Sequence, residues 1–184
     1  MDANWTHPRL GVFTYDEDVN TWAGEVEAPA FDAFTYDPGY TAAGTYELTF
    51  EAEDDRDAPS AAAVTLAERV IANADDLVPA ITTALWDDFN GRGPDSGMWW
   101  NGDLSTVADM TGSELLPPAS ADDLLALMQL FRISVRKGVN RYERPVVELC
   151  FWAAYEQEHS VGVLTDGKRV LGTGYHLDVE PFKD

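Results

Sequence analysis

The chain of 184 residues carries a formal net charge of −21, and 45% of its residues are apolar and 11% aromatic. A surface this acidic repels nucleic acid and anionic membranes and attracts basic proteins or metal ions, so we expect no nucleic acid or membrane partner. The many large apolar residues exclude a disordered chain and favour one compact domain over residues 1–184.

The charge is unevenly distributed. Residues 1–128 contain 25 Asp and Glu against 4 Arg and no Lys, whereas residues 129–184 contain 8 acidic and 8 basic side chains. The chain start lacks the pattern of a signal sequence, and no segment approaches the ~20 apolar residues of a membrane span, so a cytoplasmic protein is expected. The single cysteine, Cys150, has apolar neighbours, which predicts a buried and inert thiol.

Residues 10–53 predict an antiparallel β meander, because four segments rich in Thr, Tyr, Phe and Val are separated by turn-forming residues. In the fourth segment, Tyr46, Leu48 and Phe50 alternate with polar residues, which indicates a strand with one face in water. The four predicted strands span residues 10–15, 21–27, 31–36 and 45–53.

The periodicity becomes helical over residues 59–90. Apolar residues recur at helical spacing after Ser60, which predicts the start of a first helix. A second helix is expected to begin near Pro79 and to end near Asn90. The acidic pair at 75–76 then lies just ahead of that helix, where negative charge favours the helix dipole.

The rest of the chain predicts a loop, a short helix and more strands. Residues 91–119 are rich in Gly and Pro and predict a long loop, and Ser120 predicts the N-cap of a short helix over 120–128. Residues 129–175 predict a second antiparallel meander with an Asp-Gly hairpin turn at 166–167. The expected fold class is therefore α+β: an antiparallel meander, central helices and a second antiparallel meander in one compact domain.

The densest group of reactive side chains lies in the second meander. If its strands pair about the Asp-Gly turn, the group meets on one side of the sheet, where carboxylates beside imidazoles can perform acid–base chemistry or hold a metal. No metal-ligand spacing such as HExxH is present, and polar residues are common in solvated turns, so no catalytic residue, metal or cofactor is assigned. The group comprises Glu156, Glu158, His159, His176 and Asp178.

Two other groups are candidates for partner binding. An acidic stretch after the first meander and an acidic pair late in the second helix suit a basic protein, although acidic stretches are usually solvated turns. Two Trp residues in the glycine-rich loop offer a platform for a partner, or else fill the core under the loop. The candidate partner-binding residues are Glu53, Asp54, Asp55, Asp57, Asp87, Asp88, Trp99 and Trp100.

Both ends of the chain resemble an uncharacterised bacterial family, a domain of unknown function that often forms a stand-alone protein. The likeness rests on Glu-His-Ser-Val-Gly-Val-Leu-Thr-Asp-Gly-Lys at 158–168, on residues 170–175, and near the start on residues 7–11 and 22–24. The resemblance implies a compact bacterial α+β domain and carries no catalytic residues. In size, acidity and expected compartment, the chain is also similar to immunity proteins of bacterial toxin systems.

Three functions remain open from the sequence. The leading hypothesis is a non-enzymatic, acidic protein-binding module, such as an immunity or inhibitor protein that engages a basic partner. The alternative is a metal-dependent or acid–base hydrolase centred on the C-terminal Glu and His residues. The third is a structural domain whose acidity provides solubility or adaptation to high salt.

Overall fold

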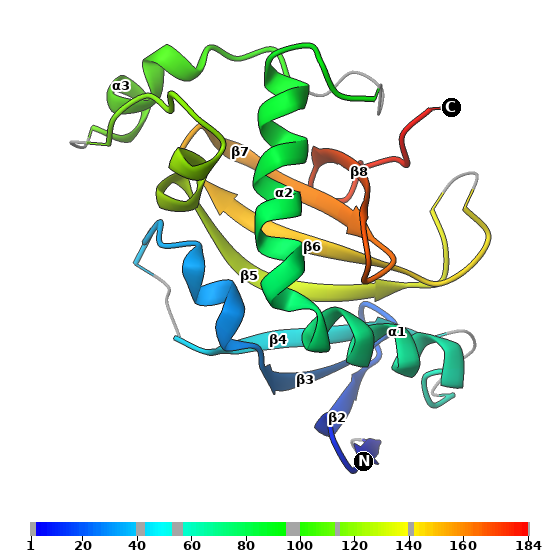
Figure 1. Ribbon diagram of the computed structural model, residues 1–184. Coiled ribbons are helices and arrows are strands. Elements are labelled where there is room, and N and C mark those ends of the chain that lie inside the picture. The colour runs from blue at the N-terminus through cyan, green and yellow to red at the C-terminus, as the bar shows by residue number, and fades with distance from the viewer. Residues whose placement is uncertain are drawn as a thin grey trace.

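The computed structural model describes residues 3–39, 43–52, 57–94, 100–112, 115–139 and 142–183. Within them, eight strands form one sheet whose spatial order follows the chain (Figure 1). The strands are β1 (Asn4–His7), β2 (Gly11–Asp16), β3 (Thr21–Glu27), β4 (Thr45–Glu51), β5 (Met128–Arg136), β6 (Val146–Ala153), β7 (Glu156–Thr165) and β8 (Val170–Tyr175).

The sheet is antiparallel except between β4 and β5, which pair in parallel with Leu48 opposite Ile133 and Phe50 opposite Val135. A parallel pair needs a long crossover connection, and the helices between the two strands provide it. The expectation of two meanders with helices between them is therefore wrong in its arrangement, because all the strands belong to one mixed sheet. The broader expectation of a mixed helix and sheet protein is confirmed.

The helices between β4 and β5 cover one face of the sheet. α1 (Ala61–Ala72) and α2 (Ala74–Phe89) lie across that face, and α2 crosses the C-terminal strands (Figure 1). Leu77, Ile81 and Leu85 of α2 are completely or almost completely buried there, and each such side chain stabilises the fold by about 1.5–3 kcal/mol. The remaining helices are α3 (Val107–Thr111) and the 3-10 helices η1 (Pro29–Ala33), η2 (Leu104–Thr106) and η3 (Asp122–Leu127).

Local interactions set the ends of α1 and α2. α1 begins directly after Ser60, close to the predicted start, and the Ser60 side chain caps it by accepting a hydrogen bond from a backbone N–H of the first turn. α2 begins at Ala74 rather than near Pro79, because Asn73 ends α1 and its carbonyl at once accepts the first N–H groups of α2. The acidic pair at 75–76 consequently lies inside the first turn. No helix in the described part of the chain combines the length and apolar character needed to cross a membrane.

Residues 31–36, predicted as a strand, do not form one. Phe31 and Phe34 are both buried, which suits the three-residue repeat of η1 and not the two-residue alternation of a strand. The Asp32 carboxylate, which lies between them in sequence, accepts a hydrogen bond from the Tyr46 hydroxyl at 2.6 Å. This aromatic run therefore docks as a turn against β4.

The segment between α2 and β5 also differs from the prediction. The expected loop over residues 91–119 contains η2 and α3. The expected short helix over residues 120–128 is η3, and Ser120 does not cap it, because the Asp123 carboxylate accepts the Ser120 N–H at 2.8 Å. Strand β1, which the sequence analysis missed, has only four residues, too few for a periodicity to be recognised.

The chain after β8 covers part of the sheet face that is turned away from the helices. We call residues 176–183 the C-terminal segment. Its Phe182 N–H donates to the Leu171 carbonyl at 2.7 Å. The close approach depends on glycine, because a Cβ at Gly172 would overlap the carbonyl oxygen of Glu180.

Replacing Gly172 with Ala should therefore loosen the C-terminal segment and lower the free energy of unfolding by about 1–3 kcal/mol. The measurements are denaturant unfolding and the rate at which a protease removes the C-terminal segment. Gly112→Ala is the control, since Gly112 has a positive φ of 58° but no neighbouring atom that a Cβ would meet. The control should cost about 1 kcal/mol without faster loss of the segment. Equal proteolysis of both variants would contradict the packing argument.

Candidate functional site

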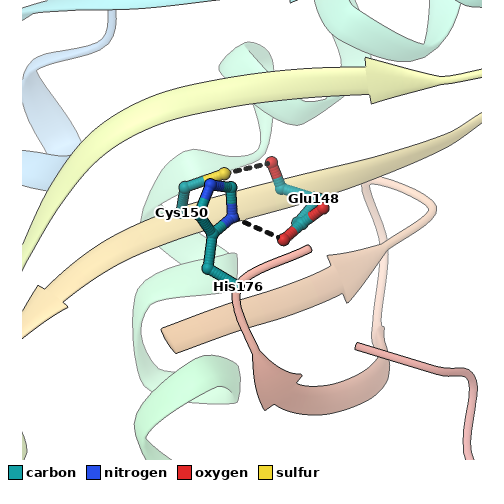
Figure 2. Close-up of side chains that lie close together, drawn as sticks. All are labelled: Glu148, Cys150 and His176. Atoms are coloured by element: carbon teal, nitrogen blue, oxygen red, sulfur yellow. Dashed lines mark hydrogen bonds and ion pairs between the residues drawn. The ribbon is translucent and has the colours of Figure 1, made fainter. Parts of the chain in front are cut away.

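Two side chains of β6 and one of the C-terminal segment meet on the sheet face turned away from α1 and α2 (Figure 2). Glu148 and Cys150 are two residues apart, so both point to that face. His176 reaches them across β7, because the residues in register between them, Gly162 and Gly174, have no side chains. Ligand atoms of Glu148, Cys150 and His176 all lie within 4.8 Å of one another.

Glu148 is the centre of this group and is only 1% exposed. Its Oε1 accepts hydrogen bonds from His176 Nδ1 at 2.8 Å and from the Leu177 N–H at 3.0 Å, and its Oε2 accepts one from Arg136 at 3.0 Å. Leu177 has a φ of 73°, a conformation that costs energy for a branched side chain. The carboxylate thus joins β5, β6 and the C-terminal segment.

The environment keeps Glu148 ionised. Burial alone would raise its pKa, but the hydrogen bonds from His176 and Leu177, together with the positive charges of His176 and Arg136, lower the pKa below the usual value of 4.5. Glu148 is therefore a buried anion at neutral pH. The sequence indicates that Glu148 is unusual, because Glu148 is the one charged residue in the otherwise apolar strand β6.

Cys150 is completely buried, as its sequence neighbours predict. Burial and the nearby charge of Glu148 raise the pKa of the Cys150 thiol well above its usual value of 9.0. Its S–H donates to the Glu148 carbonyl oxygen at 3.7 Å. A nucleophilic cysteine needs a stabilised thiolate, so the thiol by itself is unreactive here.

The structure divides the predicted Glu and His cluster into two groups. His159 contacts Glu156 at 3.2 Å and packs against the Tyr175 ring, with 4.8 Å between ring centroids. His176 instead bonds Glu148 and packs edge-on against a Phe ring of β5. Burial raises the pKa of Tyr175, and the negative charges of Glu156 and Glu158 raise it further. The two histidines thus have different carboxylate partners.

The other two members of that cluster, Glu158 and Asp178, are exposed. Neither carboxylate makes a hydrogen bond or an ion pair with another described residue. The Asp178 backbone N–H donates to the Tyr175 carbonyl at 3.1 Å, which shapes the turn after β8. The five residues of the predicted acid–base group therefore lack a common site within the described ranges.

Four of the predicted partner-binding residues lie outside the described part of the chain: Glu53, Asp54, Asp55 and Trp99. Asp57 is described and is exposed. The Asp87 carboxylate pairs with Arg92 at 3.1 Å, and the Asp88 carboxylate accepts the Thr173 hydroxyl at 2.7 Å. These two aspartates stabilise the end of α2 and its contact with β8.

Trp100 packs against aromatic residues of the core. Its ring centroid lies 5.2 Å from that of Phe89 and 5.2 Å from that of Tyr155, with the Tyr155 ring edge-on. Tyr155 is fully buried, so Trp100 lies against the core. Of the two predicted roles, a partner platform or a core residue, the second applies to Trp100.

A second group of polar residues lies on the sheet face turned away from α1 and α2, over β2, β3 and β4. The outward positions of β2, β3 and β4 include five acidic residues, together with other residues such as Val12 and Thr14. Glu25 of β3 stands directly opposite Glu47 of β4. Sequence alternation assigns each residue to a face, but only the strand register brings the carboxylates together, so the sequence analysis missed the group. We call this group the acidic face: Asp16, Glu25, Glu27, Glu47 and Glu51.

A cleft of about 430 Å³ adjoins the acidic face. β2 pairs with β3 only as far as Ala23, so the two strands diverge beyond it, and the end of α1 borders the gap. Arg9 and Glu68, which form an ion pair at 2.7 Å, lie on one side. The other lining residues are apolar or belong to the acidic face: Leu10, Gly11, Glu25, Val26, Glu27, Ile71 and Ala72.

Replacing Glu148 with Gln should lower the free energy of unfolding at neutral pH by about 3 kcal/mol, because Arg136 and His176 lose a buried anionic partner. The folded-state pKa of Glu148 is below the unfolded value, so its contribution is complete above the unfolded pKa and is lost as the pH falls through the folded one. The variant should therefore lose less stability than the wild type between about pH 6 and pH 3. Denaturant unfolding across this range is the measurement.

The control for this experiment is Glu158→Gln, which removes an exposed carboxylate of the next strand. It should leave both the stability at neutral pH and its decline in acid close to the wild type. Equal acid sensitivity in Glu148→Gln and the wild type would contradict the assignment of Glu148 as the buried anion.

Comparisons of the chain with protein-family models, with curated proteins and with solved structures find no match. The resemblance of the two chain ends to a bacterial family therefore stays a prediction. The function is argued from the geometry of the two sites described above.

Proposed function

We propose that the protein is a non-enzymatic binding protein that engages a basic protein through the acidic face. The observation that carries this proposal is the row of carboxylates on adjacent strands of the sheet face turned away from α1 and α2. The opposite face of the same strands is occupied by the core. Contact with a partner is thus available on the side where the charge is concentrated.

The charges of the acidic face are incompletely balanced within the protein. Glu47 pairs with Arg132 at 2.5 Å, but the carboxylates of Glu25 and Glu27 make no hydrogen bond or ion pair with another described residue. Like charges directly opposite each other on two strands destabilise a sheet, and Glu25 stands opposite Glu47. Cationic side chains of a partner would relieve this repulsion.

The adjoining cleft suits the side chain of a partner's Lys or Arg. Leu10, Val26 and Ile71 provide an apolar wall for the aliphatic stem, and the bordering residues Glu25 and Glu27 place the acidic face beside the cationic end. A cleft of this kind would give one basic residue of the partner a defined position. The remaining acidic residues would mainly guide the approach of the partner.

Such a mode of binding suits the immunity or inhibitor role inferred from the sequence. A toxin that acts on an anionic substrate needs a basic surface, and an acidic protein bound there blocks it. Association of this kind is fast and weakens as salt screens the charges. The proposed partner is thus a basic protein, and the carboxylates of the acidic face act in binding and not in catalysis.

The test reverses two unpaired charges of the acidic face. Immobilised wild type and the double variant Glu25→Lys/Glu27→Lys are exposed to lysate of the native host. The captured protein is then purified, and its association rate is measured over a range of salt concentrations. The double variant should slow association by about 10-fold or more at low salt and flatten its salt dependence.

The matched control is Asp109→Lys/Asp122→Lys, which changes the net charge equally at exposed positions outside the acidic face. The control should associate nearly as fast as the wild type. Equal slowing by both variants would show that net charge alone acts, and the absence of any stoichiometric basic partner would also overturn the proposal. Folding that requires molar salt would then favour the salt-adapted structural domain.

A further inference from the structure

The buried group formed by Glu148, Cys150 and His176 points to a second site, independent of the acidic face. We propose that these three residues bind a single Zn²⁺ or a chemically similar cation. The ion would join β6 to the C-terminal segment, which His176 begins (Figure 2). No part of this site belongs to the acidic face or to its cleft.

The donor atoms match the chemistry of zinc. Thiolate sulfur, imidazole nitrogen and carboxylate oxygen are its usual protein ligands, with bond lengths of about 2.0–2.3 Å. The three donors of Glu148, Cys150 and His176 already lie within 4.8 Å of one another, so an ion among them would be close to bonding distance from each. Two donors share β6, which fixes their spacing.

The charges of the site also fit a divalent cation. Glu148 is an anion in the folded protein, and binding of the metal would release the Cys150 thiol proton to solvent. The resulting carboxylate and thiolate together neutralise the two positive charges of the ion, and the Arg136 guanidinium beside Glu148 has Glu51 as its second carboxylate partner at 3.5 Å. His176 would bind as a neutral imidazole.

The surrounding residues hold the carboxylate in position. Arg136 occupies Oε2 of Glu148, which leaves Oε1 on the side of His176. The Leu177 N–H also donates to Oε1, so the orientation of the carboxylate is fixed from two directions. Hydrogen bonds of this kind to a ligand typically strengthen metal binding by 10- to 100-fold. Gly162 keeps the space beside the carboxylate clear, because a Cβ there would lie 2.7 Å from Oε1.

The experiment uses the full chain, purified without a chelator or a metal-affinity tag. Metal content is measured by mass spectrometry after addition of Zn²⁺ and removal of the excess. Co²⁺ is then titrated in its place, because a cobalt ion bound to a thiolate has a characteristic sulfur-to-metal charge-transfer absorption. One equivalent of metal and a cobalt–thiolate band are expected.

Three variants distinguish the proposed site from adventitious binding. Cys150→Ser replaces a thiol that makes one weak hydrogen bond within the described residues, so the chain should fold while the cobalt–thiolate band disappears. His176→Gln should weaken Co²⁺ binding by at least 100-fold if the segment still docks. His159→Gln is the matched control, because His159 is exposed and pairs with a different carboxylate.

The binding of Zn²⁺ should also raise the melting temperature of the wild type and slow proteolysis of the C-terminal segment, with neither effect in Cys150→Ser. If His176→Gln fails to fold, Cys150→Ser decides the result. Co²⁺ binding to the wild type without a thiolate band, equal affinity in wild type and Cys150→Ser, or no stoichiometric metal would overturn the proposal. The group would then be an ion-pair network that holds the segment without metal.

Discussion

The parallel pairing of β4 with β5 determines how the two halves of the chain are related. It places Leu48 beside Ile133 and Phe50 beside Val135, so the apolar faces of both halves form one continuous surface. The crossover required by a parallel pair must then pass over one side of the sheet, and α1 and α2 bury that apolar surface as they make it. Neither α1 nor α2 lies on the opposite side (Figure 1). Both candidate sites lie on this opposite side.

The two halves of the opposite face differ in what covers them. Over β7 and β8, Gly162 and Gly172 allow the C-terminal segment to approach the backbone, and Glu148 holds its start through His176 and Leu177. Over β2 to β4 most side chains of this face are at least partly exposed, and five of them are acidic. The charged group in the C-terminal half is therefore buried and balanced by partners. The excess negative charge of the N-terminal half is exposed. An ionised group tolerates burial only with partners, which Glu148 has.

Local interactions were largely predictable from the sequence, whereas interactions between distant residues were not. The start of α1 after Ser60, the hairpin turn at 166–167 and the alternation in β4 each depend on a few neighbouring residues, and they occur as predicted except that Thr49 of β4 is buried. The parallel pair depends on segments separated by the whole crossover, and no pattern in either strand specifies its partner. Contacts between distant residues also determine the sites. Glu148 is recognisable in the sequence as a charge in an apolar strand, but its contact with His176 depends on the register across β7. Residues 31–36 were misassigned because aromatic content suggested a strand where burial required a three-residue turn.

The arrangement of the sheet also gives the acidic face a boundary. Because β5 lies beside β4, Arg132 pairs with Glu47, and Arg136 lies 3.5 Å from Glu51 and 3.0 Å from Glu148. The first basic residues after the acidic part of the chain thus neutralise the border of the acidic face and leave Glu25 and Glu27, one strand further away, without partners among the described residues. A basic protein would accordingly be attracted most strongly to β3 and to the cleft beside it, not to the sheet as a whole. Arg136 contacts Glu51 of the acidic face and Glu148 of the buried group. It therefore lies at the boundary between a surface suited to a cationic protein and a buried group suited to a metal cation.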